Sequence, residues 1–169
     1  MREGDLEFSS TELRVRVSTR VFLYLPDQTQ NCDCFWEQLC SMNTAAAKRS
    51  FRWGSVTATF FLGSADSKVV EIGGLEIYEK WGLLRSLVIE TAFRGKGYGQ
   101  AFTRDLIEYA KLKGVREIYL LTTTAVTFFT KIGFEIVERS TVPLMIKSTS
   151  QFTSLCPASA VCLRKAMPE

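Results

Sequence analysis

The sequence contains no histidine among its 169 residues. This absence excludes a Ser-His-Asp or Cys-His nucleophile system, and it excludes every zinc site that uses a histidine ligand. Acid–base chemistry in this chain must therefore use carboxylates, tyrosine, lysine, cysteine or water.

Long apolar runs are also missing. No stretch of about 18 apolar residues occurs, so we expect no membrane-spanning helix and no membrane partner. The first twelve residues carry several carboxylates and no apolar segment, which argues against a secretory or organelle presequence. We therefore expect a cytoplasmic protein.

The excess of basic over acidic residues is small: the net charge is only +3, and the basic residues are scattered along the chain. That excess is too small to indicate a nucleic-acid partner, although it suits a site for an anionic cofactor. Apolar types make up 46% and charged types 23% of the chain, which is a globular composition. The length fits one domain over residues 1–169.

The five cysteines are an odd and unevenly spaced set, which is typical of reduced thiols rather than of a disulfide framework. Cys32, Cys34 and Cys40 could together bind a soft metal or an arsenical. Three close cysteines are more often ordinary thiols, so we predict no metal site.

Periodicity and turn residues predict a run of strands and helices from Ser55 onward. Residues 1–55 give weaker signals, with strands at Glu12–Val17 and Val21–Leu25 and a helix at Asn31–Arg49. The order of the elements predicts a mixed β-sheet with helices on its faces, an α/β (α+β) fold. The expected elements after residue 55 are strands at Val56–Leu62, Val69–Tyr78 and Leu83–Ile89, a helix at Gln100–Lys113, a strand at Glu117–Thr123, a helix at Thr124–Ile132, and strands at Phe134–Glu138 and Ala158–Lys165.

The strongest motif lies in residues 83–134, where a strand runs into a glycine-rich turn and then into a helix. Residues 94–99 read Arg-Gly-Lys-Gly-Tyr-Gly. A helix start exposes unpaired N–H groups and the positive end of the helix dipole, and glycines let the backbone close around a pyrophosphate. The Walker loop needs Ser or Thr where this chain has Gly97, and the dinucleotide fingerprint needs glycine where it has Gln100. Both are excluded, which leaves a pyrophosphate turn of another kind.

The pattern Arg-x-x-Gly-x-Gly at residues 94–99 resembles the coenzyme A signature of the GNAT superfamily of N-acetyltransferases. The strand at residues 87–89 is similar to the one that precedes this signature in the family. The string Ala-x-x-Phe-Phe-x-x-x-Gly-Phe at residues 125–134 resembles the family's later helix motif. Two motifs in the right order make the resemblance specific, and it covers about residues 56–138.

The resemblance implies a splayed mixed sheet, in which coenzyme A lies between the strand before the glycine turn and the strand after the following helix. Acetyl-CoA would be the cosubstrate, and the acceptor amine would attack the thioester directly, without a covalent enzyme intermediate. Backbone groups of the strand would hold the pantetheine arm and acetyl carbonyl, and amides of the turn would hold the pyrophosphate. The residues that the resemblance places at the cofactor are Leu87, Val88, Ile89, Arg94, Gly95, Lys96, Gly97, Tyr98, Gly99, Thr122 and Phe129.

Two positions depart from the family pattern. Many members have a tyrosine, which can protonate the leaving thiolate, where this chain has Phe129, and an asparagine where it has Thr122. Coenzyme A thiolate is a good leaving group near neutral pH, so we predict that no single side chain is essential as the general acid.

The acceptor site is expected along strand Leu83–Ile89. A hairpin closed at Tyr78 and Leu83 would place Glu76 opposite Arg85. Opposite charges in an apolar run are either a structural ion pair or a substrate clamp. In the second interpretation Arg85 binds a carboxylate or other oxyanion of the substrate, and Glu76 binds the ammonium or accepts its proton. Both are therefore candidate catalytic residues.

Strings at residues 83–87, 120–125 and 155–160 also resemble a subgroup of arsenic-resistance-associated N-acetyltransferases, which are small-molecule acetylators. The leading hypothesis is therefore transfer of an acetyl group to the primary amine of a small, amino acid-like anionic acceptor. Two alternatives stay open: acetylation of a protein N-terminus or lysine, and a non-catalytic acyl-CoA-binding module, which Phe129 would permit. Dimers are common in the family, so a homodimer could form.

Overall fold

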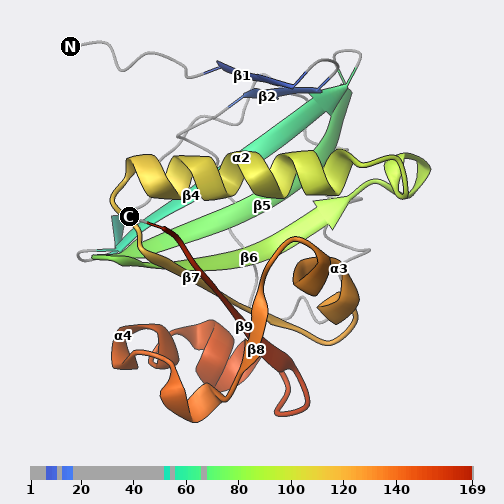
Figure 1. Cartoon of the computed structure of the whole chain (residues 1–169). Helices are drawn as coiled ribbons and strands as arrows, with labels where there is room; N and C mark the ends of the chain where they lie inside the picture. The colour runs from blue at the N-terminus through green and yellow to red at the C-terminus, as the bar shows by residue number, and fades with distance from the viewer. Residues whose placement is uncertain (1–6, 11–12, 17–51, 54–55, 66–67, 169) are drawn as a thin grey trace, which may run out of the picture.

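The computed structural model describes residues 7–10, 13–16, 52–53, 56–65 and 68–168, with side chains for residues 59–63 and 69–168. These residues form a mixed sheet with the strand order β1-β2-β4-β5-β6-β7-β9-β8, and β3 pairs with β4 beside it (Figure 1). The strands are β1 (Glu7–Ser10), β2 (Leu13–Arg16), β3 (Arg52–Trp53), β4 (Val56–Ala65), β5 (Lys68–Tyr78), β6 (Trp81–Ile89), β7 (Glu117–Thr122), β8 (Glu135–Val137) and β9 (Val161–Ala166).

Helices connect and cover these strands. The longest is α2 (Tyr98–Leu112), which follows β6 through a short 3-10 turn and the glycine-rich segment. Its apolar residues recur every three to four positions, which gives one buried face. The other helices are α3 (Val126–Lys131), α4 (Leu144–Lys147), the 3-10 turns η1 (Thr91–Phe93) and η2 (Arg139–Thr141), and the π-helical segment η3 (Gln151–Leu155).

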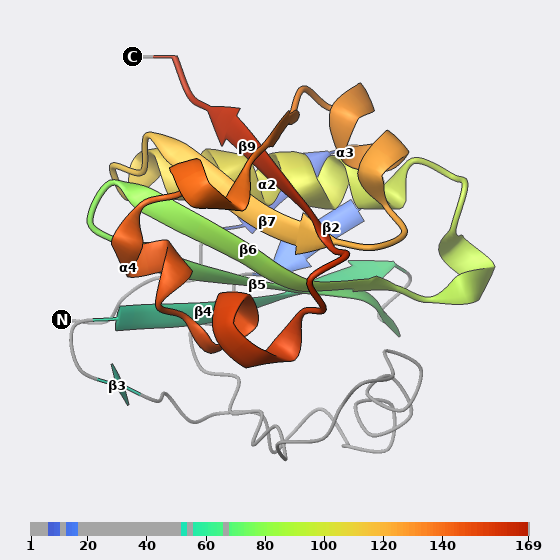
Figure 2. The same ribbon diagram turned by 90° about the horizontal axis from the view of Figure 1, so that it is seen from below.

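The core lies on both faces of the sheet because alternate residues of each strand point to opposite sides. Along β7, Ile118 and Leu120 join the apolar cluster under α2 and α3. Tyr119 and Leu121 join the second cluster, which includes Ile146 of α4. Figure 2 shows α2 and α3 on one side of the sheet and α4 on the other. The expectation of a mixed sheet with helices on both faces is confirmed.

The sheet splays between β6 and β7. These parallel strands pair only at their beginnings, where residues 81–83 lie beside residues 117–119. From there β6 continues along β5, while β7 pairs over its whole length with β9. Figure 1 shows β6 and β7 diverging toward their carboxyl ends. The splay predicted between these two strands is therefore present.

The register predicted for the β5–β6 hairpin is wrong. Tyr78 pairs with Trp81 rather than with Leu83, and Glu76 therefore lies opposite Leu83. The turn is a tight one of two residues, and Glu79 adopts a positive φ of 54°. A hairpin closed at Tyr78 and Leu83 would have a loop at Glu79–Gly82. That loop is shorter in the structure because β6 already begins at Trp81.

Other boundaries differ by a few residues. Helix α2 begins two residues before the predicted start, because Gly97 with a φ of 87° is the residue that caps it. Strand β9 begins at Val161 rather than Ala158. The predicted strand at residues 21–25 and helix at residues 31–49 lie outside the described residues. In the described part of the chain, no helix combines the length and apolarity that a membrane crossing requires.

Candidate active site

The opening between β6 and β7 exposes one edge of β6 beyond Leu83. A β-bulge lies directly on this edge: Ile72 pairs with Val88 and Gly74 with Arg85, so two residues of β6 face one residue of β5. The two residues are Ser86 and Leu87, and Ser86 has a positive φ of 53°. A bulge turns backbone groups out of the ladder, so this edge can offer them to a ligand in the opening.

The glycine turn closes one end of the opening. Gly95 and Gly97 have φ values of 75° and 87°, a conformation that residues with a Cβ rarely adopt. The first intrahelical bonds of α2 run from the amides of Gln100 and Ala101 to the Gly97 carbonyl. The amides that precede them, those of Tyr98 and Gly99, are in the helix positions that leave N–H groups free for an anion.

Gly99 differs from Gly95 and Gly97, because a side chain at this position would meet a neighbouring residue. Its φ is ordinary, but a Cβ at this position would lie 2.2 Å from Ile89 Cδ1. The absence of a side chain therefore lets the first turn of α2 approach the end of β6, which brings the pyrophosphate turn and the strand edge together.

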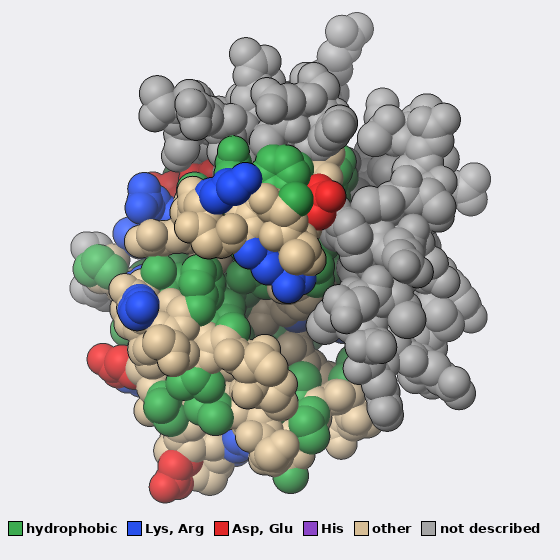
Figure 3. Space-filling model, turned by 90° about the vertical axis from the view of Figure 1, so that its right-hand side faces the viewer, with side chains coloured by type: hydrophobic (Ala, Val, Ile, Leu, Met, Phe, Trp, Pro, Cys, Tyr) green, Lys and Arg blue, Asp and Glu red, His purple; other side chains and the backbone are tan. Residues whose placement is uncertain are grey.

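Basic side chains border this turn. Arg94 Nε donates a hydrogen bond to the Ile89 carbonyl at 3.0 Å, which ties the turn to the strand end. Lys96 is exposed and lies over the Phe93 ring, 5.6 Å from its centroid. Figure 3 shows the face that carries the turn, where Lys and Arg side chains stand around a hollow whose walls include hydrophobic side chains. This environment suits an anionic ligand with an apolar arm.

The other wall of the opening is formed by the end of β7 and by α3. Thr122 Oγ1 accepts hydrogen bonds from the amides of Thr124 and Ala125, at 3.3 and 3.0 Å, so it is used to start α3. Phe129 is only 5% exposed and packs in the core. Phe128 is the half-buried neighbour, and its ring would touch a Cβ at Gly99 at 3.6 Å. Phe128 is therefore the phenylalanine of α3 that reaches the glycine turn.

Glu76 and Arg85 do form an ion pair, although the register that predicted it is wrong. Arg85 Nη1 donates to Glu76 Oε1 at 2.5 Å. The contact is diagonal, because Arg85 lies opposite Gly74 and its stem crosses that residue. A Cβ at Gly74 would lie 3.1 Å from Arg85 Cγ and 2.9 Å from the Phe60 ring, so the missing side chain makes room for both.

A third group completes this cluster. Tyr78 OH donates to the other carboxylate oxygen of Glu76, Oε2, at 2.7 Å. Burial, the hydrogen bond to Glu76 and the charge of Glu76 raise the pKa of Tyr78 well above its ordinary value, so the hydroxyl stays protonated and acts as a donor. Tyr78 was not singled out from the sequence. The available signal was its spacing of two from Glu76, which puts both side chains on one face of β5.

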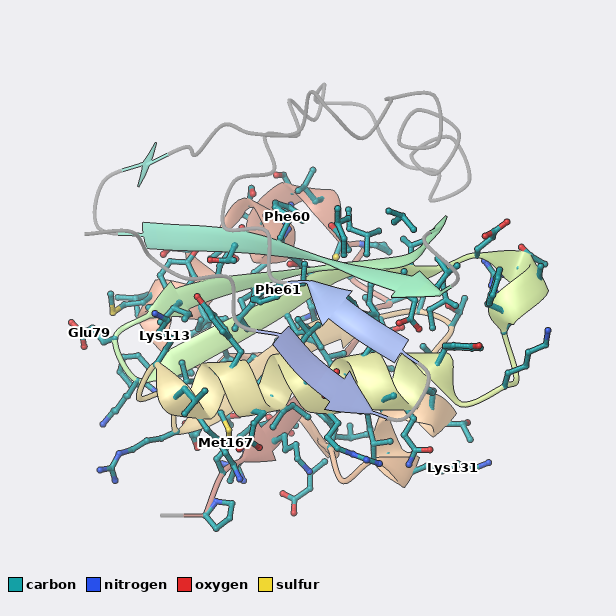
Figure 4. The ribbon with its side chains drawn as sticks, turned by 90° about the horizontal axis from the view of Figure 1, so that it is seen from above. Phe60, Phe61, Glu79, Lys113, Lys131 and Met167 are labelled. Carbon is teal, nitrogen blue, oxygen red and sulfur yellow. The ribbon has the colours of Figure 1, made fainter. Side chains whose placement is uncertain are left out.

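The cluster lies on the face of the sheet opposite α2. In Figure 4, Phe60 and Phe61 of β4 point to opposite sides, with Phe61 toward α2. Phe60 contacts the Gly74 position on the Arg85 side, while Phe61 belongs to the core under α2. The site therefore has two parts: a glycine turn that begins α2, and a buried charged cluster on the opposite face of β5 and β6.

Comparison with known proteins agrees with this geometry. A family model described as "Acetyltransferase (GNAT) family" matches residues 27–134, which is more than half of the chain. The splayed sheet, the bulge and the glycine turn define the same class, and the chain belongs to the GNAT acetyltransferase family. The arsenic-resistance subgroup is not distinguished by these comparisons.

Individual relatives are distant. The amino-acid acetyltransferase of Photorhabdus laumondii is 28% identical over 87 residues, which cover 50% of this chain and 19% of that relative's length. The N-acetylglutamate synthase of Neisseria gonorrhoeae, solved with coenzyme A and N-acetyl-glutamate, superposes with a TM-score of 0.58 and 16% identity, covering 65% of this chain and 26% of that one. The PaiA N-acetyltransferase of Thermoplasma acidophilum, solved with coenzyme A, gives a TM-score of 0.52 and 18% identity, covering 65% and 61%. These structures share the fold.

Proposed function

We propose that this chain is an acetyl-CoA-dependent N-acetyltransferase that modifies the primary amine of a small acceptor carrying a carboxylate. The observation that carries the proposal is the opening between β6 and β7, which has a bulged strand edge along one side and a glycine turn at its end. The structural neighbours from Neisseria and Thermoplasma were solved with coenzyme A, which supports acetyl-CoA as the cosubstrate.

The parts of the site have separate tasks in this proposal. Amides of residues 95–99, with Arg94 and Lys96 nearby, hold the pyrophosphate. Backbone groups of residues 87–89 hold the pantetheine arm and the acetyl carbonyl, which polarises the carbonyl for attack. Thr122 and Phe129 act indirectly, through the start of α3 and through core packing, and Phe128 lines the turn.

The reaction itself needs one bond made and one broken. The neutral amine attacks the acetyl carbon, an N–C bond forms, the C–S bond breaks, and the thiolate leaves with the electron pair. The proton from nitrogen goes to Glu76 or through it to water. No described tyrosine is expected to be essential for protonating the thiolate, because that thiolate is a good leaving group.

The anionic acceptor is inferred from Arg85. Its side chain is only 15% exposed, and one end of its guanidinium is held by Glu76. The Nε atom is buried and has no hydrogen-bond partner among the described residues. A guanidinium has five N–H donors in a fork that matches a carboxylate, so Arg85 can hold a substrate anion beside Glu76. The names of the Photorhabdus relative and of the Neisseria neighbour support an amino acid as acceptor.

Finer assignments remain part of the proposal. Membership of the arsenic-resistance-associated subgroup rests on three short strings, and a homodimer and a cytoplasmic location remain predictions. That residues 1–169 form a single domain is a prediction as well. Acetylation of a protein or peptide, and acyl-CoA binding without catalysis, are the competing functions.

Turnover separates these functions. Purified protein is mixed with acetyl-CoA, and thiol release is followed with a panel of amines that differ in one carboxylate, together with peptides that offer an N-terminus or lysine. Acetyl-CoA is titrated in parallel while thermal stability is measured, since a ligand at one hundred times its Kd adds about 2.7 kcal/mol to the free energy of unfolding.

We expect saturable stabilisation by acetyl-CoA and thiol release with amines that carry a carboxylate. Stabilisation without release for any acceptor would indicate a binding module. Release with peptides but not with small amines would indicate a protein acetyltransferase. Absence of stabilisation at millimolar acetyl-CoA would contradict the assignment of the glycine turn as a pyrophosphate site.

A further inference from the structure

Both oxygens of the Glu76 carboxylate are held, one by each strand of the hairpin. Tyr78, the last residue of β5, donates its hydroxyl to Oε2 at 2.7 Å. Arg85 of β6 donates to Oε1 at 2.5 Å. The Glu76 and Arg85 side chains are 12% and 15% exposed, so solvent competes little for these contacts. Two donors from different strands fix the plane of the carboxylate.

The fixed carboxylate still has acceptor capacity. An ionised carboxylate has about four lone-pair positions, and two of them are used here. The remaining position on each oxygen can accept a hydrogen bond from a substrate ammonium or amine. The direction of these free positions is set by the Tyr78 hydroxyl as much as by Arg85, because either bond alone would let the carboxylate rotate.

A second cluster of the same composition lies in the same sheet. Tyr119 OH donates to Glu117 Oε2 at 3.0 Å, and Arg164 Nη1 contacts Glu117 Oε1 at 3.3 Å. Here the Glu117 and Arg164 side chains are 28% and 35% exposed. In both clusters the tyrosine follows the glutamate by two positions on one strand, and the arginine comes from the neighbouring strand.

The positions of the two clusters differ in relation to the opening. Arg85 lies on β6 beyond Leu83, the last residue that pairs with β7, and directly before the bulge at Ser86 and Leu87. A strand rises about 3.3 Å per residue, so Arg85 is roughly 7 Å from Leu87 along the strand. Glu117 and Arg164 lie in the continuous β7–β9 ladder, at the closed end of the splay. The second cluster is thus a structural counterpart at the closed end of the splay, where Tyr119 lies beside Leu83 and Glu117 beside Trp81.

From this contrast we infer that Tyr78 is a positioning residue for the acceptor amine, which acts by fixing the Glu76 carboxylate. The inference rests on the proposed function. Tyr78 does not touch the reacting atoms; its hydroxyl aims the free lone pairs of Glu76 at the amine whose proton the carboxylate takes. In the described residues, Arg85 and Tyr78 are the charged or titratable groups that contact Glu76, and the neighbouring strands place Ala58 and Leu83 opposite it.

The test compares Tyr78→Phe with Tyr119→Phe, which removes the same hydroxyl from the same kind of cluster. For Tyr78→Phe we expect kcat/KM for the acceptor to fall about tenfold. Arg85 would then hold the carboxylate alone, so the free lone pairs of Glu76 would no longer be aimed in one direction. The KM for acetyl-CoA should stay the same. Tyr119→Phe should change acceptor kinetics less than about twofold, because Glu117 lies beside Trp81, where β6 and β7 are still paired, rather than beside the opening.

A double-mutant cycle shows whether Tyr78 acts through Glu76. In a Glu76→Gln background, Tyr78→Phe should lower kcat/KM no further, because the group that it positions is already gone. Additive losses in the cycle would overturn the inference. Equal losses in Tyr78→Phe and Tyr119→Phe would overturn it as well.

One measurement does not depend on turnover. The carboxyl carbon signal of Glu76, assigned in glutamate-labelled protein by its absence in Glu76→Gln, should change its chemical shift in Tyr78→Phe at one fixed pH, and it should stay unchanged in Tyr119→Phe. If no variant turns over any amine but this signal moves, the proposed function fails while the control of Glu76 by Tyr78 stands. If the protein turns over and the signal does not move, the inference about Tyr78 fails alone.

Discussion

Among single residues, Arg85 pairs with Glu76 and is the residue that we propose binds the carboxylate of the acceptor. Replacing it with alanine removes the fork that would hold the acceptor anion and leaves Glu76 with Tyr78 as its partner. We expect Arg85→Ala to raise the KM for a carboxylate-bearing amine at least tenfold, while the KM for acetyl-CoA changes less than about twofold. Steady-state kinetics with each substrate varied in turn measure both values.

The control for this substitution is Arg164→Ala, which breaks the more exposed pair with Glu117. It should leave both KM values unchanged. Arg85→Lys keeps the charge but not the fork, and it should recover only part of the acceptor affinity. An equal rise of both KM values in Arg85→Ala, with loss of folded protein, would indicate that the pair is structural only.

A different kind of residue is Glu71, whose side chain is fully buried on β5. Neither of its oxygens has a hydrogen-bond partner among the described residues, and it faces Asp105 of α2. Gly63 of β4 accommodates it, since a Cβ there would lie 2.7 Å from Glu71 Oε2. Burial, and then the charge of Asp105, raise the pKa of Glu71 from 4.5 to about 7. Burial also raises the pKa of Asp105.

This shift predicts how the stability of the protein depends on pH. Between pH 4.5 and about 7 the folded state holds a proton on Glu71 that the unfolded state has released, so the free energy of unfolding falls as pH rises. The loss is complete above about pH 7 and amounts to about 3 kcal/mol. Asp105 contributes in the same direction.

Glu71→Gln should remove most of this dependence, because a neutral amide has no charge to bury. Urea unfolding at pH 5 and pH 8 checks the prediction: the substituted protein should be the more stable one at pH 8 and similar to the unsubstituted protein at pH 5. Glu135→Gln is the control, since that side chain is 74% exposed. A free energy of unfolding that rises between pH 5 and pH 7 in the unsubstituted protein would contradict the assignment.

At the scale of elements, the junction of β6 with α2 sets the geometry of the cofactor site. The first turn of α2 lies against the Ile89 side chain, where Gly99 has no Cβ to displace it. Arg94 fastens the same turn to the Ile89 carbonyl. The position of the free helix amides relative to the strand edge therefore depends on one close contact between two elements.

Gly99→Ala is expected to displace the Ile89 side chain, because the added Cβ would lie 2.2 Å from its Cδ1. Overpacking of this kind costs about 1 to 3 kcal/mol of stability, and the KM for acetyl-CoA should rise because Ile89 lies on the strand edge proposed to hold the pantetheine arm. Gly114→Ala is the matched control at the other end of α2. Its φ of 79° makes alanine unfavourable, but no atom lies within 4 Å of the added Cβ. That substitution should lower stability and leave the KM for acetyl-CoA unchanged, as thermal unfolding and kinetics would show.

At the scale of the whole molecule, the opening exists because β7 changes partner. Its full length pairs with β9, which follows it by almost forty residues of chain, and only its beginning pairs with β6. The splay is therefore a consequence of sheet topology rather than of any residue on its edges. The two core clusters on opposite faces keep the two halves of the sheet in place on either side of the opening.

Much of this arrangement could be predicted from local signals. Alternation and turn residues placed β4 to β9 within a few positions, and the glycine pattern placed the start of α2, because these features depend on backbone conformations within a few residues. The identity of the fold followed from two motifs in the right order. The structure brings the end of the strand edge next to the glycine turn and pairs Glu76 with Arg85, while the roles of these residues in binding and catalysis are proposals.

Other features were decided only by tertiary contacts. The hairpin register depends on a two-residue turn and on a bulge opposite Gly73, and neither leaves a unique trace in the sequence. Phe128 and Phe129 are adjacent and chemically alike, and helix orientation alone decides which one enters the core.

The family, the order of strands and helices, and the glycine turn could be predicted from the residues alone, since each is encoded by neighbouring residues with restricted conformations. The tertiary structure decided that Tyr78 shares the Glu76 carboxylate with Arg85, and that Glu71 is buried without a partner among the described residues. Both depend on which strands lie side by side and on which faces they cover, and these are set by packing between segments that are distant along the chain.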